Sequence, residues 1–215
     1  MKNINKGSSL LAFILIILFA NACTTNNLEN DNLEEDLIKN DITATVLEQK
    51  EKESLLFMLE EEKLARDTYA YLNNLWSINQ FANIKKSEQS HMDAISTLLT
   101  NDHVEHTILA PGVFANKDLQ DLYNQFTIDG AKSISNALQI GATIEDLDIV
   151  DLKKYSSQTT NTAIIAVFNK LECGSRNHLR SFLKAITNNS DTYTPQFLTL
   201  EEYNSIVSSS QEKCN

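Results

Sequence analysis

Residues 83–92 read Asn-Ile-Lys-Lys-Ser-Glu-Gln-Ser-His-Met and decide the predicted fold. In a helix, residues three apart share a face, so Glu88 and His91 point the same way. Alone, such a pair is most often a solvated surface pair. Apolar residues, however, continue the same stripe at spacings of three and four, as in a buried helix face: Ile84, Ile95 and Leu98. Two ionisable groups on a buried face need partners or a metal.

Composition favours one all-α domain that does not bind nucleic acid. The chain has 215 residues, is 42% hydrophobic, and contains only 5 Gly and 2 Pro, so it has few obligatory turns. Long segments show the helical period. The formal net charge of -11 repels phosphate backbones, and no Lys/Arg stripe interleaved with aromatic residues offsets it. Nucleic acid is therefore not expected as a partner.

The N-terminal segment is predicted to be an export signal. A positive start is followed by the apolar run Leu10–Phe19 and by Ala20-Asn21-Ala22-Cys23, so residues 1–23 resemble a bacterial lipoprotein signal with Cys23 as the lipidated residue. The expected location is the cell envelope, on its periplasmic or outer-surface side, with a lipid anchor in the membrane. Ala20 occupies a place usually held by an aliphatic residue, so cleavage after Ala22 and secretion is the alternative. Residues 24–44 are predicted to be an acidic flexible tether.

The remaining two cysteines leave two interpretations open. In an oxidising compartment, Cys173 and Cys214 are compatible with a disulfide that ties the C-terminal tail to the last long helix. Two free thiols are the alternative, since sequence alone does not supply the Cα separation that a disulfide needs.

Apolar periodicity predicts four long helices and a short one within a domain over residues 45–210. They cover residues 45–77, 82–99, 131–155, 160–187 and 200–207. The short break between the first two makes them antiparallel neighbours. Residues 101–130 hold Pro111, Gly112 and a modest amphipathic piece at 118–126, and are interpreted as a crossover. His103 and His106 lie in this polar segment and are interpreted as surface residues.

Ionisable residues also replace apolar ones in the middle of the other helix stripes. Glu62 belongs to the inward stripe of the first helix, whereas Glu61 and Lys63 fall off it. The third helix carries Glu145 and Asp148 on one stripe. A competing apolar stripe on the same helix would place these two acids at its edge: Ala137, Ile140, Ile144 and Leu147.

The fourth long helix carries His178 at mid-stripe, and the sum of these positions predicts a metal site. Together the helices present four carboxylates and two imidazoles: Glu62, Glu88, His91, Glu145, Asp148 and His178. This is the ligand inventory of a carboxylate-bridged di-iron or di-manganese site. The usual Glu-x-x-His is absent from the fourth helix, where Ser175 precedes His178 by three, and the second acid of the third helix replaces the missing carboxylate.

These motifs resemble the ferritin-like superfamily, and within it an uncharacterised bacterial and archaeal family known only by a domain-of-unknown-function label. The resemblance covers Leu55–Val207 and rests on four motifs: residues 61–67, 87–92, 141–149 and 174–179. It implies a four-helix bundle of up-down, long crossover, up-down order with a short C-terminal helix. It also implies two iron ions as cofactors, with manganese or another divalent metal as alternatives. Tyr69, seven residues after Glu62, resembles a tyrosine that often neighbours the metals there.

Two main functions follow as hypotheses. The first is a di-iron oxidoreductase that oxidises ferrous iron or reduces oxygen or peroxide. The second is an envelope-anchored helical binding or structural module without redox activity, and metal capture without turnover is a third. A homodimer is compatible with the sequence, although no pattern calls for one.

Overall fold

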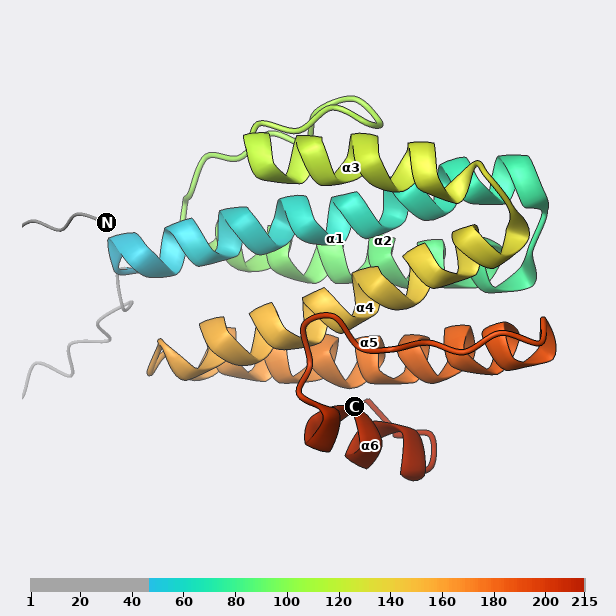
Figure 1. Ribbon diagram of the computed structural model, residues 1–215. Helices are drawn as coiled ribbons and strands as arrows, with labels where there is room; N and C mark the ends of the chain where they lie inside the picture. The colour runs from blue at the N-terminus through green and yellow to red at the C-terminus, as the bar shows by residue number, and fades with distance from the viewer. Residues whose placement is uncertain (1–46, 215) are drawn as a thin grey trace, which may run out of the picture. The chain divides into compact units, whose positions relative to one another are not determined.

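The computed structural model describes residues 47–214, and this range is entirely helical outside its loops (Figure 1). Its helices are α1 (Gln49–Trp76), α2 (Asn79–Asn101), α3 (Lys117–Gly130), α4 (Ile134–Ser157), α5 (Thr162–Asn188) and α6 (Leu200–Ser208). The all-α class is confirmed, and each predicted long helix begins within about one helical turn of its expected start. The predicted signal, Cys23 and the tether lie outside the described residues. No helix in the described range is both long and apolar enough to cross a bilayer.

The four long helices lie side by side as two pairs. The closest pairs are α1 with α2 and α4 with α5, and the pairs meet where α1 contacts α4 and α2 contacts α5. The break between α1 and α2 is two residues long, so these helices are antiparallel. Figure 1 shows that α4 runs in the same direction as α2, because the crossover returns the chain along the length of the molecule. The second pair therefore runs down-up, which corrects the expected up-down order.

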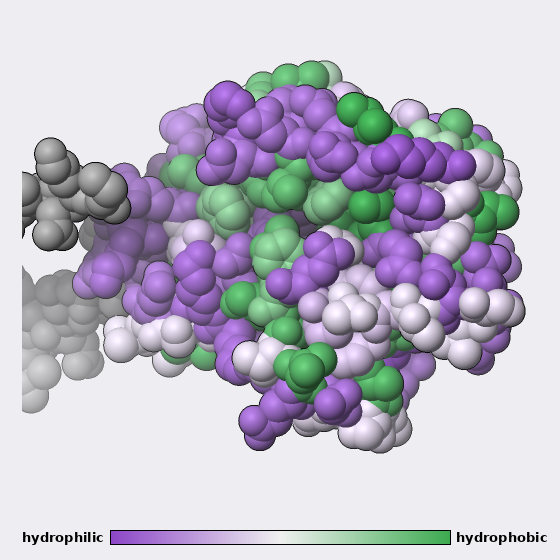
Figure 2. Space-filling model, viewed as in Figure 1, coloured by the Kyte–Doolittle hydropathy of each residue, from purple (hydrophilic) through white to green (hydrophobic). Residues whose placement is uncertain are grey.

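The crossover contains a full helix, α3, where the sequence indicated only a modest amphipathic piece. The Asn116 side chain caps it by accepting hydrogen bonds from the backbone N–H groups of Asp118 and Leu119. Leu119 and Phe126 are buried, because α3 packs against α1 and α4. Most of the outer surface of α3 is hydrophilic (Figure 2). Helix α3 thus covers a second face of α1.

The prediction that Lys63 and Glu61 fall off the buried stripe is wrong, since both side chains are buried. The Lys63 ammonium donates hydrogen bonds to Asp67 Oδ2 at 2.6 Å and to the carbonyls of Ala110 and Val113 at 3.1 and 3.0 Å. Its partners offset the cost of burying the ammonium, and removal of those partners would leave a buried, unpaired charge at a high cost in stability. Lys63 therefore holds the crossover segment against α1 through these hydrogen bonds.

The far end of α3 is fixed to the end of α1. The indole Nε1 of Trp76 donates a hydrogen bond to the carbonyl of Gly130 at 2.9 Å. Gly130 has no side chain, and a Cβ placed there would lie 2.6 Å from Leu72. Only glycine permits so close a contact without displacing that leucine.

The hydrophobic core is divided into two clusters, one on each side of a polar layer. One cluster includes Tyr69, Phe81 and Phe182, and the other includes Met58 and Phe168. The predicted site residues lie at intermediate positions along the helices, so they are enclosed by apolar side chains at both ends of the layer.

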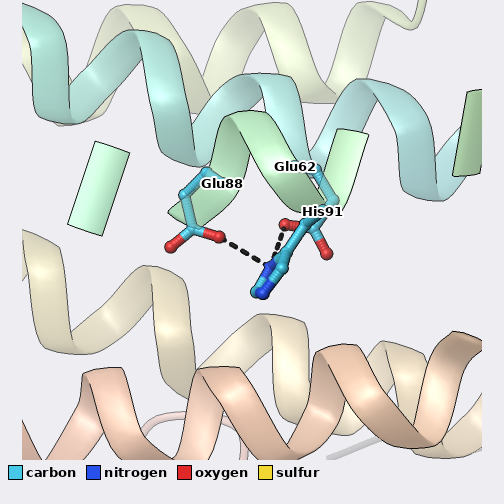
Figure 3. A group of neighbouring side chains, drawn as sticks. All are labelled: Glu62, Glu88 and His91. Carbon is cyan, nitrogen blue, oxygen red and sulfur yellow. Dashed lines mark hydrogen bonds and ion pairs between the residues drawn. The ribbon is translucent and has the colours of Figure 1, made fainter. Parts of the chain in front are cut away.

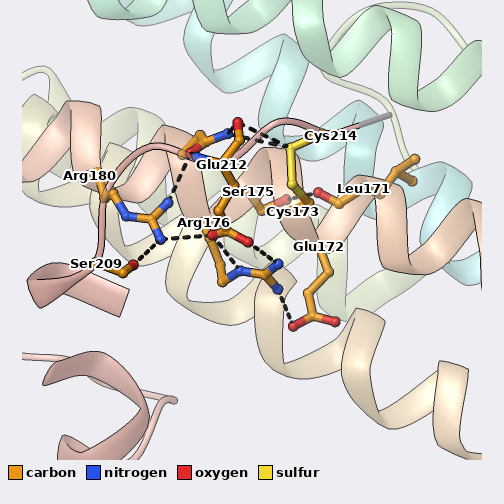
Figure 4. The surroundings of a disulfide bond; sticks show 10 residues. Leu171, Glu172, Cys173, Ser175, Arg176, Arg180, Ser209, Glu212 and Cys214 are labelled. Carbon is orange, nitrogen blue, oxygen red and sulfur yellow. Dashed lines mark hydrogen bonds and ion pairs between the residues drawn. A yellow bond between two sulfur atoms is a disulfide. The ribbon is translucent and has the colours of Figure 1, made fainter. Parts of the chain in front are cut away.

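The C-terminal tail is tied to α5 by a disulfide between Cys173 and Cys214 (Figure 4). Of the two interpretations left open by the sequence, the structure has the disulfide. Beside it, the Glu212 carboxylate accepts hydrogen bonds from Arg176 at 2.9 and 2.6 Å and from Arg180 at 2.7 Å. The tail is therefore held by one covalent bond and by a group of charge-assisted hydrogen bonds.

The loop before α6 is organised by the buried carboxylate of Asp146 on α4. It accepts hydrogen bonds from Tyr193 Oη at 2.8 Å and from three consecutive backbone N–H groups: Gln196, Phe197 and Leu198, at 2.5, 3.1 and 2.7 Å. No uncharged side chain of similar size accepts four hydrogen bonds this way.

We expect Asp146→Ala to lower the free energy of unfolding by about 3 kcal/mol, because it leaves buried donors without an acceptor. Urea denaturation followed by circular dichroism measures this. The control Asp121→Ala removes an exposed carboxylate of α3 and is expected to cost less than about 1 kcal/mol. Equal losses in the two variants would contradict the role given to Asp146.

Candidate metal centre

The centre begins with the Glu88–His91 pair of α2, which projects into the space between the four long helices. His91 Nδ1 lies 2.8 Å from Glu88 Oε2 and 3.1 Å from Glu62 Oε2, which comes from α1 (Figure 3). The i, i+3 spacing places both α2 side chains on one face, as the sequence predicted. These residues form the first three-residue group whose ligand atoms are close enough to hold one ion.

A second group shares Glu88 with the first. His178 Nδ1, from α5, lies 2.9 Å from Glu88 Oε1 and 3.4 Å from Glu145 Oε2, which comes from α4. Each oxygen of Glu88 therefore faces a different imidazole. The rings of His91 and His178 are stacked with their centroids 5.6 Å apart. The two groups, Glu62-Glu88-His91 and Glu88-Glu145-His178, form the candidate metal centre.

Several buried polar atoms in this centre have no hydrogen-bond partner. They are Glu62 Oε1, Glu88 Oε1, Asp148 Oδ1 and His178 Nδ1. The short contact between Glu88 Oε1 and His178 Nδ1 therefore brings two ligand atoms together without the directionality of a hydrogen bond. Buried polar groups are nearly always paired in folded proteins. Oxygen and imidazole donors left open in this way fit divalent iron, manganese or zinc.

Asp148 stands beside the two groups but belongs to neither. Its Oδ2 accepts a hydrogen bond from Ser175 Oγ at 2.5 Å, and both residues are buried. Ser175 occupies the position three before His178 where the usual motif has a glutamate. Ser175, which departs from the usual pattern, thus orients Asp148, the carboxylate that was expected to replace the missing glutamate. The competing apolar stripe of α4 does not push Glu145 and Asp148 out to an exposed edge, because Glu145 is buried as well as Asp148.

Tyr69 supports the centre from α1. Its hydroxyl donates a hydrogen bond to Glu145 Oε1 at 2.5 Å and lies 3.3 Å from the carbonyl of Gly141. A Cβ on Gly141 would lie 2.4 Å from Phe182, so glycine lets α4 and α5 approach closely at this level. Tyr69 thereby fixes one oxygen of Glu145 and leaves the other directed at His178.

Burial and mutual charge shift the ionisation of the centre in opposite directions. Burial raises the pKa of Glu62 to about 7, against the lowering effect of His91. Burial alone would raise the pKa of Glu88, but His178 and His91 hold it well below its usual value. Burial alone would lower the pKa of His178, but Glu88 and Glu145 raise it to about 10. Without metal, Glu88 is thus the carboxylate that both imidazolium groups favour as an anion.

Burial also raises the pKa values of the acids around this core. The pKa of Asp148 lies well above its usual value because of burial and the charges of Glu62 and Glu61. Burial and the charge of Glu88 raise the pKa of Glu145, against the lowering effects of His178 and Tyr69. Negative charge in this layer therefore exceeds what two imidazoles offset.

Two neighbours of the centre were not found from the sequence. Glu61 is 2% exposed, and neither of its carboxylate oxygens has a hydrogen-bond partner. Gly174 lies against His91, since a Cβ there would be 2.8 Å from His91 Nε2. The signal for Gly174 was available as a glycine inside a helical pattern, which often marks close packing. Glu61 gave no signal, because it lies off the apolar stripe of α1, beside the charges of Asp151 and Lys154 on α4.

The two histidines of the crossover do not join the centre. His103 is exposed, and His106 Nδ1 contacts the carbonyl of Val104 at 3.0 Å. Their interpretation as surface residues agrees with these positions.

Comparison with known proteins places the chain in a family. Residues 51–210 match the uncharacterised protein domain DUF2202. The chain belongs to the DUF2202 family. An uncharacterised protein of Methanocaldococcus jannaschii, MJ0754, is 46% identical over 169 residues, which is 78% of this chain and 91% of that protein.

A solved structure from the same archaeon has a similar fold. The crystal structure of the hypothetical protein MJ0754 matches with a TM-score of 0.76 and 46% identity, over 77% of this chain and 96% of that chain. The resemblance to a domain-of-unknown-function family is thus confirmed.

Proposed function

We propose that this chain is an exported, lipid-anchored, ferritin-like protein that binds two metal ions, iron in the first place, and oxidises ferrous iron or reduces oxygen or peroxide. One observation carries the proposal: two groups of ligand atoms from four helices share the single carboxylate of Glu88. A carboxylate whose two oxygens face two imidazoles is suited to bridge two ions.

Charge supports two ions rather than one. Glu62, Glu88, Glu145 and Asp148 supply four negative charges when ionised, and two divalent cations offset them. Without such cations, this layer holds buried oxygens with no partner. In this proposal, Glu62 and His91 would hold one ion, Glu145 and His178 would hold the other, and Glu88, which belongs to both groups, would serve both. Asp148, oriented by Ser175, lies at the edge of the pair.

The reaction follows from what the metals supply and what the chain controls. When bound, a ferrous pair supplies two electrons, the number that reduces one hydrogen peroxide and two protons to two water molecules. The Tyr69 hydroxyl holds Glu145 in place by donating a hydrogen bond to it, and its phenol would be the group of the chain that supplies an electron to bound metal. The apolar clusters exclude bulk water from the two ends of the layer.

Export and lipid anchoring are proposed from the sequence of residues 1–23, with Cys23 as the lipidated residue. The Cys173–Cys214 disulfide supports this, because disulfides persist in oxidising compartments outside the cytoplasm.

Elemental analysis of the full-length chain reconstituted anaerobically with ferrous iron tests the proposal. We expect two irons per chain, and oxygen or peroxide consumption as the iron is oxidised. Stoichiometric metal without consumption would leave metal capture as the function. A chain that binds no metal and is indifferent to chelator would overturn the proposal and leave a helical envelope module with a polar core.

A further inference from the structure

A cavity of about 620 Å³ opens between α2 and α5, and its lining includes both His91 and His178. This volume lies within the range typical of small-molecule sites. It is many times the roughly 30 Å³ that one water molecule occupies, so it is far larger than oxygen or peroxide requires. The cavity therefore has room for an organic molecule next to the centre.

The two imidazoles turn their outer edges toward this cavity. Their Nδ1 atoms face the carboxylates of the centre, and Gly174 lies against Nε2 of His91. The side chains are 11% and 12% exposed, although Nδ1 of His178 is buried, so the outer edge of that ring holds the exposed part. Within residues 47–214, no hydrogen bond from Nε2 of either ring is formed.

These edges are hydrogen-bond donors when the metals are bound. A histidine that binds metal through Nδ1 carries its ring proton on Nε2, and that proton almost always finds an acceptor. Here the stacked rings of His91 and His178, with an interplanar angle of 24°, direct two such protons toward one cavity. Within residues 47–214 neither ring has a hydrogen-bond acceptor at Nε2, so a bound molecule with acceptor atoms would complete both hydrogen bonds.

The rest of the lining adds one cation and several neutral polar groups. Lys170 is exposed at the rim, and Ser87 and Gln211 add further polar groups. The carboxylate of Glu212 also lines the cavity, but Arg176 and Arg180 already occupy both of its oxygens. The Lys170 ammonium, unlike the Glu212 carboxylate, therefore forms no ion pair within the described residues.

One wall of the cavity is apolar. It includes Ala94, Val167, Leu171 and Cys214, whose disulfide fixes the tail in place (Figure 4). A hydrocarbon chain placed against this wall would be removed from water, which favours binding in proportion to the apolar area buried.

We propose that this cavity binds a small organic carboxylate. Its oxygens accept hydrogen bonds from Nε2 of His91 and His178, Lys170 offsets its charge, and its hydrocarbon part lies against the wall at Val167. The assignment rests on the proposed function, because bound metal is what places the ring protons on Nε2. It deepens that function by giving the centre an organic ligand beside oxygen or peroxide.

Titration of the zinc-loaded, full-length chain with hexanoate tests this, followed by NMR of the histidine ring N–H signals. We expect the Nε2–H signals of His91 and His178 to shift and saturate. Acetate should bind at least about tenfold more weakly, since it lacks the hydrocarbon part. Hexanol has the hydrocarbon part but no carboxylate, and inorganic phosphate has anionic oxygens but no hydrocarbon part. Both should leave the signals nearly unmoved.

Variants of residues in the cavity lining distinguish specific binding of hexanoate in the cavity from nonspecific binding elsewhere on the protein. Lys170→Glu should weaken hexanoate binding about tenfold, whereas Lys184→Glu, also exposed on α5 but outside the cavity, should change it by less than about twofold. Val167→Trp should fill the cavity and abolish hexanoate binding while zinc content stays unchanged.

The outcomes distinguish this proposal from the metal proposal. Two zinc ions per chain with unmoved Nε2–H signals would overturn the carboxylate site alone, as would hexanoate binding that survives Val167→Trp. If the chain binds no zinc, the metal-free chain is titrated in the same way. Binding that Lys170→Glu and Val167→Trp then weaken would keep the cavity as a carboxylate site and overturn its dependence on metal, and absence of binding would overturn the carboxylate site.

Discussion

Glu88→Ala should lose both metal ions, with metal content falling from two per chain to near zero. The reason is that Glu88 belongs to both ligand groups and that its two oxygens face different imidazoles. Removing a ligand that belongs to one group alone, as in Glu62→Ala, should leave the other ion in place. We expect metal affinity to fall more than about 100-fold in Glu88→Ala, because the loss of a ligand exceeds the 10- to 100-fold effect of an outer partner.

Anaerobic iron loading followed by elemental analysis and competition with a chelator measures this loss. Asp93→Ala is the matched control, since it removes an exposed carboxylate from the same helix. Metal content in Glu88→Ala that stays at half or more of the parent value would show that Glu88 is not a shared ligand.

The metal-free chain should become less stable as pH rises from 5 to 8. The pKa of Glu62 in the folded chain is about 7, above its ordinary value of 4.5, so the folded state binds more protons than the unfolded state between these values. Its contribution to stability is fully present below pH 4.5 and is lost as pH rises through 7, a loss of about 3 kcal/mol. His178, with a pKa near 10, acts in the same direction.

Denaturant unfolding of the chelated protein at several pH values checks this dependence. The metal-loaded protein should not show it, because bound cations take the place of the protons. Glu62→Gln keeps the shape of the side chain but cannot ionise, so the stability of its metal-free form should fall less with pH. A parent chain and a Glu62→Gln variant with equal pH dependence would contradict the assignment to Glu62.

The sequence predicted the candidate site better than it predicted what surrounds it. Glu62, Glu88, Glu145 and His178 were found because a helix repeats its faces every three to four residues, and an ionisable residue in an apolar stripe stands out. The same rule excluded Glu61, since its burial depends on a helix more than fifty residues further along the chain. Burial by an element that is distant in the chain does not appear in the apolar periodicity of the helix that it covers.

Asp148 illustrates a second limit. A stripe assigns a residue to a face, but the rotation of the helix and the rotamer decide which neighbour the side chain reaches. Asp148 reaches Ser175 rather than either ligand group. The direction of α4 was also missed, because a crossover of about thirty residues can return the chain to either end of a bundle.

The hydrogen bond between Trp76 and Gly130 gives the molecule an optical probe. Trp76 is the only tryptophan of the chain, so all indole fluorescence comes from the point where the end of α1 meets the end of α3. Along α1, Trp76 lies roughly 21 Å from Glu62, at a rise of about 1.5 Å per residue. Its emission therefore reports separation of the crossover helix from α1, while circular dichroism reports loss of the long helices. Any interval between the two signals during unfolding would mark a state in which the long helices persist without α3.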